Sequence, residues 1–142
     1  MRTKTVVIAT LVGSAVIAAE PAPFSAPRYV DRAAPVTVCG LNAASLDQVA
    51  NVLVEKGGVR EAAGDQKFLA FESLDRTHIW TFTRLGHAAH PAVICRELKD
   101  SAAGLAIGMD FVCGGSRLEC DALYGEFVDL NEAMKEKARK PS

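Results

Sequence analysis

Four cysteines limit what this chain can fold into more than any other feature. All of them follow residue 38, at positions Cys39, Cys95, Cys113 and Cys120. An even number of cysteines in a small exported chain predicts disulfides. Redox-active or metal-binding cysteines are the alternatives, but the spacing contains no C-x-x-C pair and matches no common zinc pattern. We therefore expect a small fold that is held by two covalent bridges.

The N-terminus has the pattern of a secretory signal peptide, which we place at residues 1–19. Two basic residues precede an uncharged apolar run over residues 5–19, and small residues close that run. Glu20 and Pro21 end it before the roughly 20 apolar residues that a membrane-spanning helix needs. We expect cleavage after residue 18 or 19, export, and no stable membrane anchor afterwards. An uncleaved membrane anchor is the alternative.

Cleavage would leave roughly 123 residues, which is enough for one domain with a single core. The net charge of −1 would fall to about −3 with the loss of Arg2 and Lys4, and no clustered positive face indicates a nucleic-acid partner. Residues 20–35 contain four of the six prolines. Because proline disfavours helix and sheet interiors, we predict a flexible leader over 20–35 and a single domain over 36–142.

Apolar periodicity outlines that domain. The S-x-x-Q box from Ser45, the helical spacing after it and the stop at Gly57 predict a helix over residues 46–56. Four strand-like runs follow, rich in β-branched and aromatic residues, at 67–73, 77–83, 92–98 and 104–113. Their short connections favour antiparallel neighbours, because parallel strands need long crossovers.

A second helix closes the chain. The S-x-x-E box of Ser116 and Glu119 begins it, an apolar stripe runs through Leu123 and Phe127, and basic residues fill its last turn. The order of elements predicts an α+β fold: a helix, a four-stranded antiparallel sheet and a long C-terminal helix. We expect both helices to cover one face of that sheet.

The element order also bears on the cysteine pairing, for which three arrangements exist. Cys113 ends the last predicted strand, and Cys120 lies one turn into the helix that follows a two-glycine turn. Such a turn can bring the two Cβ atoms near disulfide distance. We therefore favour Cys113 with Cys120 and Cys39 with Cys95.

All three histidines, and the only tryptophan, lie between residues 77 and 97. His87 and His90 form an H-x-x-H, but Pro91 disfavours a helix at His90, and a metal site needs at least a third ligand. We expect neither a metal centre nor a cofactor. Metal binding by His87, His90 and His78, or a small enzyme that uses them with Asp110, is the alternative.

Trp80 and Phe82 alternate with His78 along one strand face. They can be core residues under a helix, with His78 at the rim of the strand. Otherwise His78, Trp80, Phe82 and Arg84 form an aromatic binding surface. We favour the core, because two helices must bury their apolar stripes.

Catalytic patterns are not evident. The serines lack a G-x-S-x-G elbow, the glycines form no phosphate loop, and no partner acid for Asp110 can be identified. We predict a protein that acts by binding rather than by catalysis.

The segments WTFT (80–83), HPAVICR (90–96) and CGGS…CDAL (113–123) resemble short exported bacterial proteins to which no function is assigned. The similar region covers about the last half of the chain. The resemblance implies a bacterial periplasmic or secreted protein, and it transfers no catalytic residue. The expected function is a binding or accessory role, of which an inhibitor or immunity protein for a cell-envelope partner is one form.

Overall fold

The computed structural model describes residue 13 and residues 25–140. The signal peptide that we predict over residues 1–19 therefore lies outside the described residues, apart from Gly13. No helix among the described residues is both long enough and apolar enough to cross a membrane.

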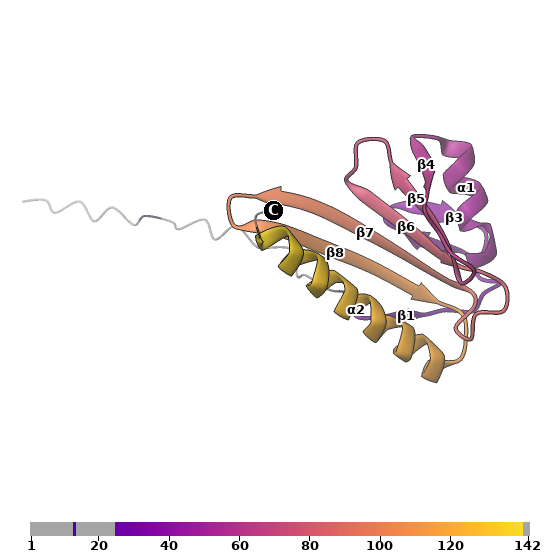
Figure 1. The fold of residues 1–142 in the computed structure, drawn as a ribbon. Helices are drawn as coiled ribbons and strands as arrows, with labels where there is room; N and C mark the ends of the chain where they lie inside the picture. Colours follow the sequence, from indigo (N-terminus) through magenta and orange to yellow (C-terminus); the bar gives the residue numbers. More distant parts are fainter. Residues whose placement is uncertain (1–12, 14–24, 141–142) are drawn as a thin grey trace, which may run out of the picture.

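The main sheet has six strands rather than the four that we predict (Figure 1). Its order is β1-β8-β7-β6-β5-β4, and all neighbours are antiparallel except β1 and β8. The four predicted runs correspond to its last four strands in the chain, whereas β1 and β4 are additional edge strands. The strands are β1 (Arg28–Tyr29), β4 (Val59–Ala62), β5 (Phe68–Ser73), β6 (His78–Thr83), β7 (Ala92–Ser101) and β8 (Gly104–Cys113).

Strand β1 changes the expected role of the proline-rich leader. The Val30 amide donates to the Cys113 carbonyl at 2.9 Å, and the Arg28 guanidinium lies 2.7 Å from the Asp110 carboxylate. The prediction of a flexible leader over 20–35 is thus wrong for this part, which adds a parallel edge strand to the sheet. Proline-rich sequence can occupy an edge because an edge strand needs only one row of hydrogen bonds.

A small hairpin and the first helix come next in the chain. Strands β2 (Val36–Val38) and β3 (Leu41–Ala43) are joined by Cys39 and Gly40, which both have positive φ angles as a two-residue hairpin turn requires. A 3₁₀ turn, Leu46–Gln48, leads into α1 (Val49–Lys56), and Gly57 ends the helix at φ 77°. The predicted helix is confirmed, but the Ser45 side chain forms no cap hydrogen bond.

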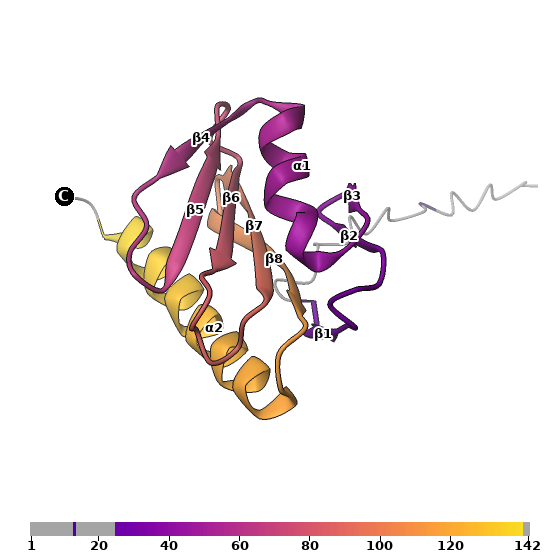
Figure 2. The same ribbon diagram turned by 90° about the vertical axis from the view of Figure 1, so that its right-hand side faces the viewer.

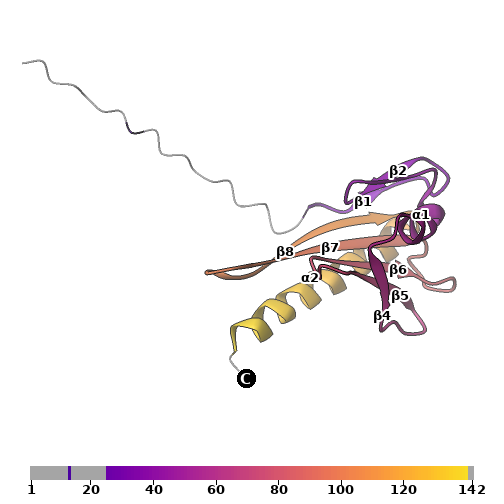
Figure 3. The same ribbon diagram turned by 90° about the horizontal axis from the view of Figure 1, so that it is seen from above.

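The two helices lie on opposite faces of the sheet, so the prediction that they share one face is wrong. Figure 2 shows α1 and α2 (Arg117–Arg139) on opposite sides of the strands, and Figure 3 shows β2 above β7 and β8 with α2 below them. The central strands are apolar on both sides: Val93 and Ile94 point to opposite faces, and both are buried. A sheet with two apolar faces needs a cover on each.

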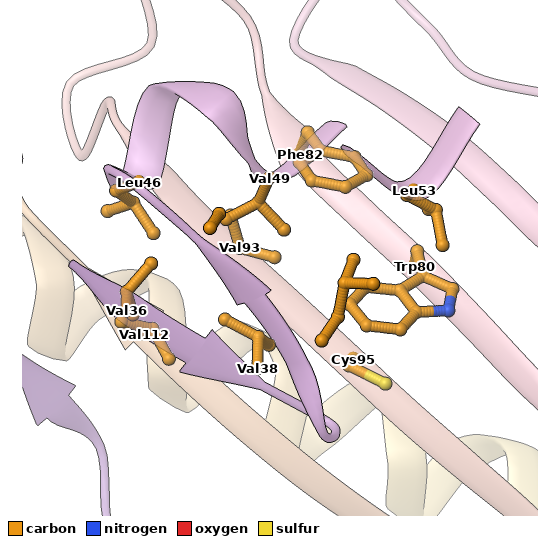
Figure 4. Close-up of a cluster of buried hydrophobic side chains, with 12 residues drawn as sticks. Val36, Val38, Leu46, Val49, Leu53, Trp80, Phe82, Val93, Cys95 and Val112 are labelled. Carbon is orange, nitrogen blue, oxygen red and sulfur yellow. The ribbon is translucent and has the colours of Figure 1, made fainter. Parts of the chain in front are cut away.

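The first face packs against α1 and the hairpin. Trp80 and Phe82 are 5% and 6% exposed beneath α1, which contributes Val49 and Leu53 (Figure 4). The core interpretation of the two aromatic residues is therefore confirmed.

The second face packs against α2. The Ser116 side chain accepts a hydrogen bond from the Glu119 amide at 3.4 Å, which confirms half of the predicted capping box. The buried stripe of the helix meets Ile94, Met109 and Phe111 of the sheet. That stripe consists of Cys120, Leu123, Phe127 and Asn131.

Both predicted disulfides are present. Cys39–Cys95 links the turn of the hairpin to the middle of β7, and Cys113–Cys120 links the end of β8 to the first turn of α2. Each face of the sheet is thus bonded covalently to the layer that covers it.

Candidate binding groove

Helix α2 covers only part of its face of the sheet. It packs mainly against β8 and covers the outer strands β4, β5 and β6 only in part on that side. The result is a hollow of about 630 Å³ between these strands and α2, which we name the α2 groove. Its lining residues are Ala62, Ala63, Gly64, Asp65, Phe68, Ala70, Ile79, Thr81, Arg96, Glu126, Phe127 and Leu130.

Side-chain size explains why a hollow forms there. Ala62 of β4 lies opposite Ala70 of β5, which lies opposite Thr81 of β6. The same row continues with Ile94 and Phe111, the large residues beneath α2. Small side chains on the outer strands thus leave the space, and large ones on the inner strands support the helix.

Arg96 of β7 lies on the floor of the groove. It stands opposite Ile79 of β6 and is only 6% exposed. Its Nη1 lies 3.4 Å from the Asn131 side-chain oxygen and 3.2 Å from the Met134 sulfur, and its guanidinium carbon lies 5.3 Å from the centre of the Phe127 ring. These polar and ring contacts, within the described part of the chain, are all with neutral groups.

The charge of Arg96 is not paired: Asp65 and Glu126 line the same groove, but neither forms an ion pair with it. No carboxylate within the described part of the chain pairs with it, and its Nε is buried without a hydrogen-bond partner. Burial lowers the pKa of the guanidinium, because desolvation disfavours the charged form. Arginine nevertheless stays protonated in proteins, so the site holds a buried positive charge. Buried charges are normally paired, and this exception calls for an explanation.

The mouth of the groove is shaped by the connection between β4 and β5. The Asp65 carboxylate accepts hydrogen bonds from the Lys67 and Phe68 amides at 2.7 and 2.9 Å, and these bonds hold the pKa of Asp65 below its usual range. A Cβ on Gly64 would lie 2.5 Å from the Phe68 carbonyl oxygen. The tight turn therefore needs glycine at this position.

The structure separates the histidines of the predicted alternative metal site. His78 begins β6, whereas His90 Nδ1 lies 2.9 Å from the hydroxyl of Thr83 at the other end of that strand. Six strand residues span roughly 17 Å. His87 accepts a hydrogen bond from the Ala89 amide at 3.0 Å, with its ring 5.1 Å from Phe68. No three metal-binding side chains come together among the described residues.

The predicted binding surface is divided in a similar way. Trp80 and Phe82 are core residues, His78 borders a small separate hollow, and Arg84 is exposed with its Nε 2.8 Å from the Asp65 carbonyl. These four residues do not form an open aromatic face. The Asp110 carboxylate is bound by Arg28 and by the Cys39 amide at 2.7 and 2.9 Å, so it connects the edge strand to the hairpin.

Sequence analysis overlooked Arg96, which emerges as the most unusual residue of the fold. The signal for it was present: the run AVICREL places a cation directly after four residues of a buried strand. Alternation assigns Arg96 to the same face as Ile94, and a charged residue at an inward-facing position is uncommon.

Comparisons with models of known protein families, with curated proteins and with solved structures find no match for this chain. The resemblance to short exported bacterial proteins stays a prediction.

Proposed function

We propose that the protein is a non-catalytic binding or accessory protein of the bacterial periplasm or the secreted fraction. Its expected partner is a protein of the cell envelope, and an inhibitor- or immunity-like role is one form of this function. The observation that supports a binding role is the α2 groove, an open apolar hollow with a buried, unpaired cation on its floor.

The construction of the groove suits binding. Ligand sites are typically hollows of 300–1,000 Å³ with apolar walls and a few polar groups that converge. The α2 groove has this size, and Arg96 and Thr81 are the polar groups of its floor. The Cys113–Cys120 bridge holds the first turn of α2 against β8, and a rigid wall lowers the entropy lost on binding.

Export is supported by the two bridges, because disulfides persist mainly in oxidising compartments. Both close within the same small domain, as they commonly do in secreted scaffolds.

The proposal is tested by capture of partners from a periplasmic extract on the immobilised, oxidised protein. We expect a partner that is retained by the wild type and lost with Ala70→Trp, which fills the groove between Ala62 and Thr81. The matched control is Ala122→Trp, which adds the same indole at an exposed position of α2.

Capture that is equal for the wild type and both variants would show that the groove is not the partner site. Thermal unfolding of each variant, followed by circular dichroism, verifies that the tryptophan has not disrupted the fold.

A further inference from the structure

Arg96 lacks the anion that a buried cation normally has. Its polar contacts within the described part of the chain are the Asn131 amide oxygen and the Met134 sulfur, and both are neutral. The nearest acid on the same row of the sheet is Glu72, two strands away, and Arg60 and Arg76 pair with it. None of the described acids therefore pairs with Arg96, and a bound anion can supply its counter-charge.

Thr81 offers a second polar group on the same floor. It is 6% exposed, and its hydroxyl has no hydrogen-bond partner among the described residues. Thr81 lies next to the Ile79–Arg96 pair on that face of the sheet. A hydroxyl donor beside a guanidinium is a suitable pair of partners for the two oxygens of a carboxylate.

The charges at the rim limit the ligand to one negative charge. Asp65 and Glu126 line the mouth of the groove, and the floor holds only Arg96 to balance an anion. A dianion such as a phosphate monoester would leave an excess negative charge near these two carboxylates. A monoanion neutralises the guanidinium without that repulsion.

The walls limit the rest of the ligand to apolar groups. Ala62, Ala70, Ile79, Phe127 and Leu130 supply carbon surfaces and no side-chain hydrogen bonds. The backbone of a bound peptide would lose its hydrogen bonds to water against such walls, and each unsatisfied group is costly. A hydrocarbon chain or an aromatic ring has no such requirement.

We infer that the α2 groove binds a small apolar monocarboxylate, a medium-chain aliphatic or aromatic acid, with its carboxylate on Arg96 and Thr81 and its apolar part along α2. This inference goes beyond the proposed function, because a protein partner can be captured whether or not the groove binds such an acid. The ligand that we infer is a free small-molecule acid.

The test is isothermal titration calorimetry of the oxidised protein with decanoate below its micelle concentration. We expect one decanoate per chain, and affinity at least tenfold weaker for 1-decanol and for decyl phosphate. Decanol keeps the chain but lacks the charge, whereas decyl phosphate adds a second charge.

Variants of the groove test which residues bind decanoate. Arg96→Met is expected to weaken decanoate binding at least tenfold, Thr81→Val by several-fold, and Ala70→Trp to abolish it. The matched control is Arg139→Met, which removes an exposed arginine from the last turn of α2. This variant should leave decanoate binding unchanged.

Equal affinity for decanoate and decanol, or unchanged binding by Arg96→Met, would overturn the inference, and so would the lack of any heat with decanoate. Binding of an apolar peptide with a free C-terminus, but not of decanoate, would also overturn it and would assign the groove to a protein terminus. If Arg96→Met does not fold, Thr81→Val and Ala70→Trp decide the outcome. Capture of an envelope protein together with no decanoate binding would refute this inference alone.

Discussion

The two faces of the sheet share the same central strands but differ in how completely they are covered. On the α1 face, Phe71 lies opposite Trp80, and the hairpin and helix cover both. On the α2 face, the neighbouring positions Ala70 and Thr81 lie opposite each other and line the α2 groove. The α1 face is a hydrophobic core that includes the outer strand β6, whereas the α2 face is a core over β7 and β8 with the α2 groove beside it.

This difference shows how one sheet can serve stability and binding at the same time. Adjacent residues of a strand point to opposite faces, so a change of side-chain size at alternate positions alters one face and leaves the other intact. Among the residues that the structure describes, the α1 face contains no buried charged side chain, whereas the α2 face contains Arg96. Strong hydrophobic packing on one side can therefore compensate for an unpaired cation on the other.

The largest effects on stability are expected from the two disulfides, one on each face. Replacing Cys39–Cys95 with two serines should lower the free energy of unfolding by about 4 kcal/mol, because the bridge closes a long loop. Replacing Cys113–Cys120 should cost about 2.5 kcal/mol, because its loop is short. Urea unfolding monitored by Trp80 fluorescence measures both.

A reductant added to the wild type is the control and should lower the melting temperature at least as much as the Cys39→Ser/Cys95→Ser variant. Identical melting curves with and without the reductant would show that the bridges do not stabilise the fold.

A pair of matched leucines compares the packing of the two faces. Leu53→Ala on α1 removes a side chain that is 4% exposed and should cost about 3 kcal/mol. Leu130→Ala on α2 removes one that is 44% exposed at the edge of the groove, and it should cost less than about 1 kcal/mol. Chemical denaturation gives both values, and similar costs would mean that the groove is closed in solution.

The unpaired charge of Arg96 is expected to make the α2 face less stable than its apolar area suggests. Arg96→Met keeps a long side chain beside Phe127 and removes the desolvation cost, so the free energy of unfolding should rise by about 1 kcal/mol. Arg96→Lys retains the charge and should not stabilise the protein. A loss of more than about 2 kcal/mol with Arg96→Met would indicate that the guanidinium contacts are structural.

The smallest effect concerns Asp75, in the turn between β5 and β6. Hydrogen bonds from the Ser73 hydroxyl and from Thr77 lower the pKa of Asp75 to about 2. A carboxyl whose pKa is lower in the folded state stabilises the fold above its unfolded pKa of about 3.9, and this contribution is lost as the pH falls towards 2. Asp75→Asn should therefore melt slightly earlier than the wild type at pH 6, and this difference should shrink as the pH falls towards 2.

Thermal unfolding from pH 6 to pH 2 provides the comparison for Asp75, and a difference that does not shrink over this range would contradict the assignment. Glu61→Gln is the control, because this residue is an exposed acid of the neighbouring edge strand.

Much of the fold could be predicted from local patterns. The alternation in THIWTFT and AVICREL defines β6 and β7, and helical spacing defines α1 and α2. The pairing of Cys113 with Cys120 also follows from local geometry, since a strand, a turn and a helix start lie within eight residues. Edge strands are harder to predict: β1 has two residues, and β4 (VREA) is short with exposed charges, so neither has a strong pattern.

By itself, the sequence determined the α+β composition, the central strands, both helices and the Cys113–Cys120 bridge, because each depends on residues that are neighbours or that share one periodic pattern. Only the tertiary structure decided that the helices take opposite faces, that residues 28–30 join the sheet, and that Arg96 lies in a groove without a counter-charge. These features depend on which distant segments meet, and periodicity along the chain does not specify which partner covers a buried face. That no described acid pairs with Arg96 is a feature of this kind, because it becomes evident only when every neighbouring strand and helix is in place.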